Sequence, residues 1–170
     1  MSVVAFEKLL TPGLKPGVTA FHHKGEWAIH EALSVLLSFT GPADVMIETF
    51  NVSEAALRPM FFGVEDGSIR SLKMILDVNV KRHKLEMLLF AAGITPTIHI
   101  TVNHAKVLLI KNDKYKIGIV GSANANQPMR YEAGFLFCNQ DGLFDFFEKE
   151  FFKVLQEDSI PFEWNLQENS

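Results

Sequence analysis

Helix-like and strand-like segments alternate along the first half of the sequence, and this order restricts the possible folds more than any other feature. The helix expected over residues 27–38 has apolar residues at Ile29, Leu33, Leu36 and Leu37, the spacing of one buried stripe. The further expected elements are a strand over 44–52, a helix that Ser53 caps and that stops near Gly63 and Gly67, a strand over 71–80 and a helix over 81–93. Parallel strands need crossover connections, so the order predicts an α/β domain with a mixed sheet flanked by helices.

The second half has a different pattern, with three β-rich stretches in quick succession over 97–110, 115–122 and 131–138. Their short connections predict antiparallel pairing. A final helix is expected over 141–158, and its apolar stripe indicates core or subunit contact: Leu143, Phe144, Phe147, Phe151, Val154 and Leu155. We expect residues 1–170 to form one domain, with an ordered core over about 20–158 and a loose tail over 165–170.

Composition is typical of a soluble globular protein, with 48% hydrophobic and 21% charged residues in 170. The single cysteine, Cys138, cannot form a disulfide within the chain, which favours a reducing cytoplasm. The N-terminal segment lacks the pattern of a secretory signal, and no apolar run approaches about 18 residues. The sequence therefore predicts a cytoplasmic location with no membrane segment.

The charge is unevenly distributed, although the formal net charge is only −4. From Arg70 to Lys116 there are nine basic residues and three acidic ones, Asp77, Glu86 and Asp113. A basic middle in an acidic chain can steer a polyanion to one face. The same lysines can equally be the solvated sides of a helix and two strands.

A hairpin-like stretch over 103–126 contains the residues that suggest chemistry. His104 and Lys106 are two apart, so in a strand their side chains point the same way. A turn over 111–114 would return the chain and bring Ser122 and Asn124 back beside them. The sequence thus predicts that His104, Lys106, Ser122 and Asn124 converge.

This group of residues suits a phosphodiester. An imidazole can attack phosphorus, while the Lys106 ammonium and the Asn124 amide can hold the nonbridging oxygens. Gly121 would let backbone N–H groups approach the same oxygens.

The stretch from His104 to Asn124 resembles the HxK…GSxN signature of the phospholipase D superfamily, in both motifs and in their separation. The resemblance implies a phospholipase D-like fold and a two-step reaction through a phosphohistidine, with no metal or cofactor. A second histidine would protonate the leaving oxygen. Because the chain has one motif, it resembles the small homodimeric nucleases of the superfamily, in which His104 of both copies would share one site. Glu132 matches the acidic residue that orients the histidine, or is a plain carboxylate at the start of a strand.

One position departs from that pattern. Lys111 occupies the place of the family's aspartate, and the nearest aspartate, Asp113, is either a turn-former or a displaced equivalent. We therefore keep three functions open. The first is a metal-independent nuclease acting on nucleic acid, the second is a hydrolase of phospholipids or other small phosphodiesters, and the third is a noncatalytic nucleic-acid-binding module.

Other candidates have weaker support. His22, His23 and Lys24 could border a site, but neighbouring side chains on a strand face opposite ways. A zinc site from His83, His99 and His104 lacks ligand spacing, so no metal is predicted. Asn126 could contact a phosphate or cap the following turn, and Arg130 is assigned no role.

Overall fold

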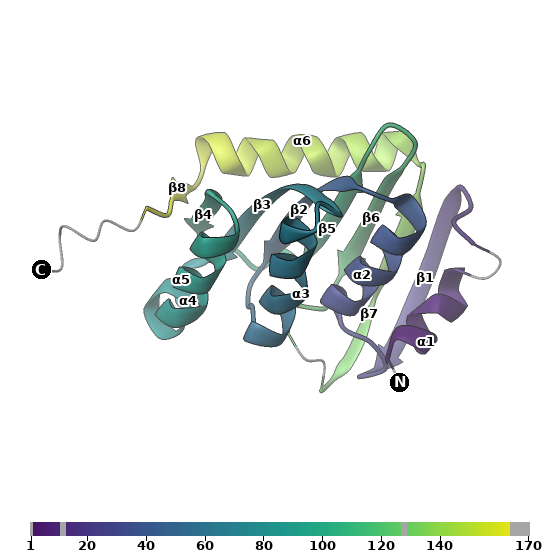
Figure 1. Cartoon of the computed structure of the whole chain (residues 1–170), viewed down its shortest axis with the longest axis horizontal. Helices are drawn as coiled ribbons and strands as arrows, with labels where there is room; N and C mark the ends of the chain where they lie inside the picture. The colour runs from purple at the N-terminus through teal and green to yellow at the C-terminus, as the bar shows by residue number, and fades with distance from the viewer. Residues whose placement is uncertain (1, 11–12, 127–128, 164–170) are drawn as a thin grey trace, which may run out of the picture.

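The computed structural model describes residues 2–10, 13–126 and 129–163, and its strands form one mixed eight-stranded sheet (Figure 1). The strand order across the sheet is β1-β7-β6-β5-β2-β3-β4-β8. The strands are β1 (Gly17–Lys24), β2 (Ala43–Thr49), β3 (Ile69–Asp77), β4 (Thr97–Thr101), β5 (Val107–Lys111), β6 (Lys116–Gly121), β7 (Tyr131–Cys138) and β8 (Ile160–Pro161). The helices are α1 (Ser2–Glu7), α2 (Ile29–Thr40), α3 (Glu54–Glu65), α4 (Val78–His83), α5 (Leu85–Ile94) and α6 (Asp141–Glu157), with a 3₁₀ turn over Lys8–Leu10.

The predicted α/β class and the mixed sheet flanked by helices are confirmed. β2, β3 and β4 are parallel and are linked by helical crossovers, whereas β5, β6, β7 and β1 run antiparallel to their neighbours. The side chain of Ser53 accepts a hydrogen bond from the N–H of Ala56 at 3.3 Å and so caps α3 as expected. The predicted tail over 165–170 lies outside the described residues.

The helices cover the two faces of the sheet unequally (Figure 1). The larger core packs α1 to α5 against one face, and a smaller core packs α6 against the other through Phe144 and Phe151. Alternate residues of each central strand serve the two cores, as Val45 and Met46 do. Among the described residues, no helix has the length and apolar character needed to cross a membrane.

Helix α6 leaves part of its face of the sheet exposed, and we call this part the β1–β7 face. It consists of outward side chains on the two strands at that end of the sheet: Val18, Ala20, His22, Lys24, Tyr131, Ala133 and Phe135. Three large members are exposed by half or more, Val18 by 51%, Tyr131 by 66% and Phe135 by 55%. Exposed apolar area of this kind on a sheet is available for contact with another molecule.

Three strand predictions were wrong in extent. The strand expected over 44–52 ends at Thr49. The strand expected over 71–80 ends at Asp77, because the Asp77 side chain accepts from the N–H of Asn79 at 2.8 Å and begins α4. The strand expected over 97–110 is two strands, since β4 pairs with β3 and β5 pairs with β2. The connection over 102–106 must therefore cross the ends of β3 and β2, and His104 and Lys106 lie in this connection rather than in a strand.

Candidate phosphodiester site

Six of the predicted site residues gather at one end of the sheet, where β2 and β6 end and β5 and β7 begin: His104, Lys106, Ser122, Asn124, Asn126 and Glu132. They line an open pocket of about 520 Å³. Its lining consists of Phe50, Asn51, His104, Lys106, Ser122, Asn124, Asn126, Met129, Arg130, Tyr131 and Glu132. The convergence of His104, Lys106, Ser122 and Asn124 expected from the sequence is therefore present, although a loop and not a strand presents the first two.

His104 and Lys106 form a pair at the mouth of the pocket. The exposed His104 ring lies against Phe50, with 5.1 Å between ring centroids. Lys106 Nζ is 3.0 Å from His104 Nδ1 and donates to the His104 carbonyl at 2.7 Å. Burial lowers the pKa of Lys106, and the nearby Glu132 carboxylate opposes that shift. A cation thus sits beside an accessible imidazole, as an attack on a phosphate anion requires.

Ser122 and Glu132 are bonded to each other. The Ser122 hydroxyl donates to the Glu132 carboxylate and accepts from the N–H of Ala133 at 3.0 Å. Within the described chain the Glu132 carboxylate therefore bonds Ser122, and the bond to His104 that the family resemblance implies is not formed. A carboxylate held in this way keeps negative charge close to Lys106.

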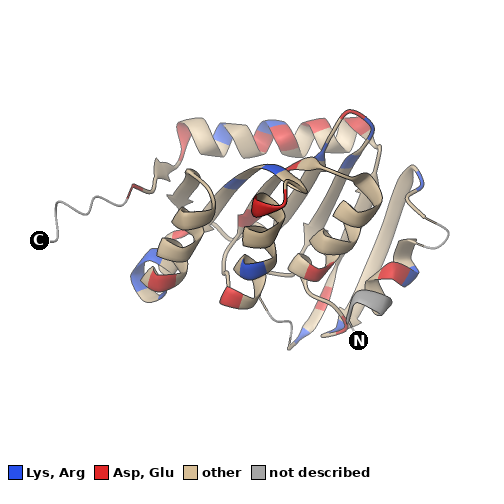
Figure 2. Ribbon diagram, in the orientation of Figure 1, with Lys and Arg blue, Asp and Glu red and all other residues tan. Residues whose placement is uncertain are grey.

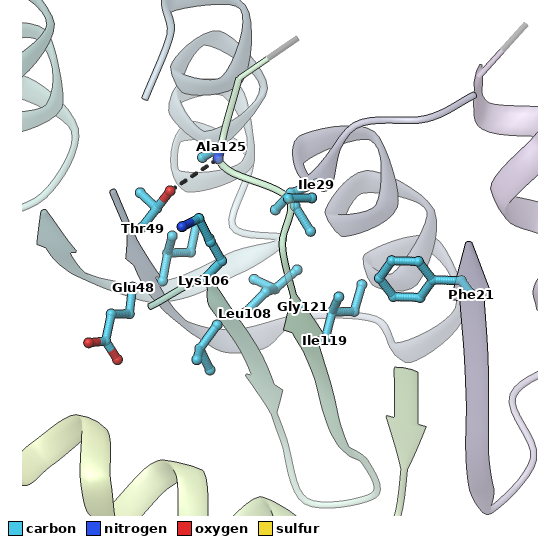
Figure 3. Close-up of a pocket in the computed structure, with 12 residues that line it drawn as sticks. Phe21, Ile29, Glu48, Thr49, Lys106, Leu108, Ile119, Gly121 and Ala125 are labelled. Atoms are coloured by element: carbon cyan, nitrogen blue, oxygen red, sulfur yellow. Dashed lines mark hydrogen bonds between the residues drawn. The ribbon is translucent and has the colours of Figure 1, made fainter. Parts of the chain in front are cut away.

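The Asn124 amide has a defined orientation. Its Oδ1 lies 3.3 Å from the N–H nitrogen of Asn51 and 3.3 Å from Thr49 Oγ1. Thr49 is only 2% exposed and also accepts from the N–H of Ala125 at 3.2 Å, the bond drawn in Figure 3. Because the backbone donor of Asn51 requires an oxygen, the NH₂ end of the amide is left for the pocket. Asn124 can thus donate to a phosphate oxygen.

Gly121 is needed for strand packing. A Cβ there would lie 2.4 Å from the carbonyl oxygen of Ala133, because β6 and β7 approach closely at Gly121 and Gly134. The Gly121 N–H points to the Lys106 carbonyl at 3.4 Å, and the Ser122 N–H donates to Ala133 at 3.0 Å. Both N–H groups are thus already bonded to backbone and are not free to bind a phosphate oxygen.

A small cavity lies beside the Lys106 stem (Figure 3). It measures about 10 Å³, and its lining is mostly apolar, including Phe21, Ile29, Leu108 and Ile119. An apolar space of this size stays dry. Its apolar lining residues surround the lysine stem, and its volume leaves no room for a ligand.

A buried aspartate, Asp77, anchors the loop that carries His104. Asp77 is 3% exposed, and its two carboxylate oxygens accept from the N–H groups of Asn79 at 2.8 Å and Asn103 at 2.9 Å. Asn103 in turn accepts from the N–H of Ala105 at 2.9 Å, on the far side of His104. Burial alone would raise the pKa of Asp77, but the N–H donors from Asn103 and Asn79 outweigh it and the pKa lies below its ordinary value.

We expect Asp77→Asn to lower the free energy of unfolding at pH 7 by about 1–3 kcal/mol, because an amide cannot accept from both N–H groups. A carboxyl whose folded pKa is lowered contributes its full stability above its unfolded pKa of about 3.9, and that contribution is lost as the pH falls through the folded value. Urea unfolding at a series of pH values should show the gap between wild type and variant closing in acid. The matched control is Asp158→Asn on the exposed end of α6. A gap independent of pH would contradict this account.

Lys111 and Asp113 both lie away from the pocket. Lys111 Nζ forms an ion pair with both Glu148 oxygens in α6, at 2.9 and 3.1 Å. Asp113 is exposed in the turn between β5 and β6, at the opposite end of the hairpin from His104. The structure therefore does not bring Asp113 to the site, and the departure at Lys111 falls at a helix contact.

The candidates with weaker support lie in different parts of the structure. Asn126 and Arg130 line the pocket, and His22 stacks on Tyr131 with 5.4 Å between ring centroids. His23 is buried, which lowers its pKa. His99 Nδ1 is 2.8 Å from Ser159 Oγ, at the other end of the strand order. In the described ranges, His, Cys, Asp and Glu side chains do not gather in threes as a metal ion would need.

Sequence reasoning missed part of the pocket wall: Phe50, Asn51, Met129 and Tyr131. Phe50 and Asn51 lie just beyond β2, and no motif marks them. The predicted parallel pairing of β2 with β3 would have placed the end of β2 near the end of β3. That pairing is the signal in the sequence from which Phe50 and Asn51 could have been placed at the site. Tyr131 begins β7, directly before Glu132.

Comparison with solved structures identifies the fold. No protein-family model matches the sequence, and no curated protein does. Three structures that share the phospholipase D superfamily fold are similar to this chain, so the chain has the phospholipase D-like fold.

NucT from Helicobacter pylori superposes with a TM-score of 0.64 at 17% identity, over 86% of this chain and 100% of NucT. Polyphosphate kinase from Porphyromonas gingivalis gives a TM-score of 0.60 at 13% identity, over 88% of this chain and 27% of the kinase. Phosphatidylserine synthase from Haemophilus influenzae gives 0.55 at 16% identity, over 85% of this chain and 40% of the synthase. Identities this low establish the fold alone.

Proposed function

We propose that this chain is a phosphodiesterase, most specifically a nuclease, that uses His104 as nucleophile without a metal ion. The observation that carries the proposal is the meeting of the His104 ring, the Lys106 ammonium and the Asn124 amide in one open pocket of a phospholipase D-like fold. Each group has a chemical part in phosphoryl transfer, and the three come from segments up to 20 residues apart.

In the proposed reaction the unprotonated His104 imidazole attacks phosphorus, a P–N bond forms, and the P–O bond to the leaving group breaks. A second histidine gives its proton to the leaving oxygen. That histidine then takes a proton from water, whose oxygen attacks the phosphohistidine, breaks the P–N bond and releases the phosphomonoester. Lys106 and Asn124 stabilise the charge that develops on the nonbridging oxygens.

The second histidine is His104 of another copy, so the proposal includes a homodimer. A twofold axis places identical residues opposite one another, which allows one motif per chain to supply both histidines. The β1–β7 face supports this part, because it exposes Phe135 and Tyr131, and Tyr131 also lines the pocket. We propose that Glu132 orients a histidine once the two copies meet.

Nucleic acid is the preferred substrate over phospholipid. NucT, which this chain covers at full length, is a nuclease of the phospholipase D family. Arg130 and Lys106 line the pocket and suit a polyanion. The similarity to phosphatidylserine synthase keeps a lipid or small phosphodiester as the alternative on the same fold.

A noncatalytic nucleic-acid-binding module is the second candidate, and a specific similarity favours it. TrmBL2, described as an archaeal chromatin protein with a novel mode of DNA binding, gives a TM-score of 0.55 at 11% identity, over 94% of this chain and 60% of TrmBL2. Salt-sensitive DNA binding without cleavage, unchanged in His104→Ala, would support this candidate.

The proposal is tested by diesterase assays in excess EDTA, with a chromogenic aryl diester, an oligonucleotide, a plasmid and phosphatidylcholine vesicles in parallel. We expect turnover of the chromogenic diester and of nucleic acid at a rate that EDTA does not change, because no step needs a metal. A requirement for Mg²⁺ or Zn²⁺ would contradict the histidine mechanism. Turnover of lipid but not of nucleic acid would replace the nuclease with the lipid alternative.

A further inference from the structure

A second hollow, of about 630 Å³, adjoins the candidate site at the corner between α4 and α5. It is lined by Val52, Ser53, Glu54, Arg82, His83, Lys84, Leu85, Glu86 and Met87. Figure 2 shows basic and acidic segments of the ribbon together at this corner, on the left of the view. We call this hollow the α4–α5 corner.

The corner and the site share a wall. Lys84 Nζ donates to Asn51 Oδ1 at 2.7 Å and to the Val52 carbonyl at 3.3 Å. Asn51 also lines the pocket of His104, and its N–H is bonded to Asn124. The site and the corner therefore lie on either side of the contact between Asn51 and Lys84.

Apart from His83, the lining carries two basic side chains, Arg82 and Lys84, and two acidic ones, Glu54 and Glu86, and Arg58 beside it adds one further positive charge. Arg82 and His83 are exposed, and Lys84 is half-buried in the shared wall. Of the two carboxylates, Glu54 accepts from Arg58 Nε at 2.8 Å within α3, and Glu86 opposes the corner's cations from α5. These cations also have a purely structural explanation, because basic side chains in the last turn of α4 balance its helix dipole. That account does not explain why one of the cations of the hollow, Lys84, also bonds Asn51 of the site.

We propose that the α4–α5 corner binds the backbone phosphates that flank the scissile one, so that the site acts on a polymeric phosphodiester, a nucleic-acid strand, in preference to an isolated diester. This inference rests on the proposed function and names the substrate of the same site. A lipid carries one phosphodiester and would leave the corner unused. A nucleic-acid strand carries a phosphate at every step and would place one against Arg82.

Arg82→Gln tests the proposal on two substrates and by binding. The KM for an oligonucleotide should rise about three- to tenfold, and the slope of log affinity against log salt should fall by about 0.7–0.9, the effect of removing one phosphate contact. The kcat/KM for a small chromogenic diester should not change, because that substrate does not reach the corner. Lys149→Gln, exposed on α6, removes the same charge elsewhere and should change none of these values.

Binding of a fluorescent oligonucleotide, measured by anisotropy in parallel, separates the two proposals. If the wild type hydrolyses neither substrate but Arg82→Gln still weakens binding and lowers the salt slope, the proposed function fails and the corner stands. If oligonucleotide KM, affinity and salt slope match those of Lys149→Gln, the corner is not a phosphate site. An equal loss on the small diester would also overturn it, since the variant would then have disturbed the site itself.

Discussion

His104→Ala is expected to lower kcat/KM for a chromogenic diester by about 10³-fold or more, since it removes the group that forms the bond to phosphorus. The fold should tolerate the change. The His104 side chain is exposed, and its neighbours are the Phe50 ring and the Lys106 ammonium. An exposed substitution of this kind shifts the free energy of unfolding by no more than about 0.5 kcal/mol. Steady-state kinetics in EDTA, with a urea unfolding curve for each variant, measures both quantities.

A matched control keeps this result specific. His99→Ala removes another histidine, at the opposite end of the strand order, where Ser159 is its partner. It should retain wild-type turnover. A phosphoryl adduct that is stable in base and labile in acid should form on the wild-type protein and be absent from His104→Ala. Turnover by His104→Ala close to the wild-type rate would refute the nucleophile assignment.

The convergence of the site was predictable because it depends on one hairpin. β5 and β6 pair antiparallel, and their turn returns Ser122 to the level of Lys106. The side-chain direction was predicted on a wrong basis, since residues 102–106 are not strand. The run from 97 to 110 has continuous β character in sequence, and only the sheet order reveals that it changes neighbours.

The supporting residues were not predictable, because they act across pairings that a single sequence does not reveal. In the sequence Asp77 counted only as an acid in a basic stretch, yet it bonds Asn103 across 26 residues. Thr49 and Asn51 meet Asn124 across more than 70 residues. The role of Gly121 was likewise hidden, since the close approach of β6 and β7 depends on register. The motif residues are close together in the sequence and can be recognised there. The residues that orient them are brought into contact by the packing of distant strands.

Phe135→Asp is expected to separate the proposed dimer and to lower activity nearly as far as His104→Ala does. Phe135 is 55% exposed on the β1–β7 face, between the exposed Val18 and Tyr131. Full burial of a phenylalanine contributes about 1.5–3 kcal/mol, and a twofold interface would bury it twice. An aspartate at the same place would put two unpaired like charges into that interface. Each separated chain would then keep its own His104 and lack the partner's histidine, the group that protonates the leaving oxygen.

Sedimentation velocity and turnover, measured over the same concentration series, check this prediction together. Wild type should be a dimer with constant specific activity, whereas Phe135→Asp should be a monomer with little activity and an unchanged circular dichroism spectrum. Phe62→Asp is the matched control, because Phe62 is 62% exposed on α3, over the opposite face of the sheet. It should remain dimeric and active. A wild type that is monomeric and fully active at every concentration would rule out the shared site, because one chain would then supply both proton transfers by itself.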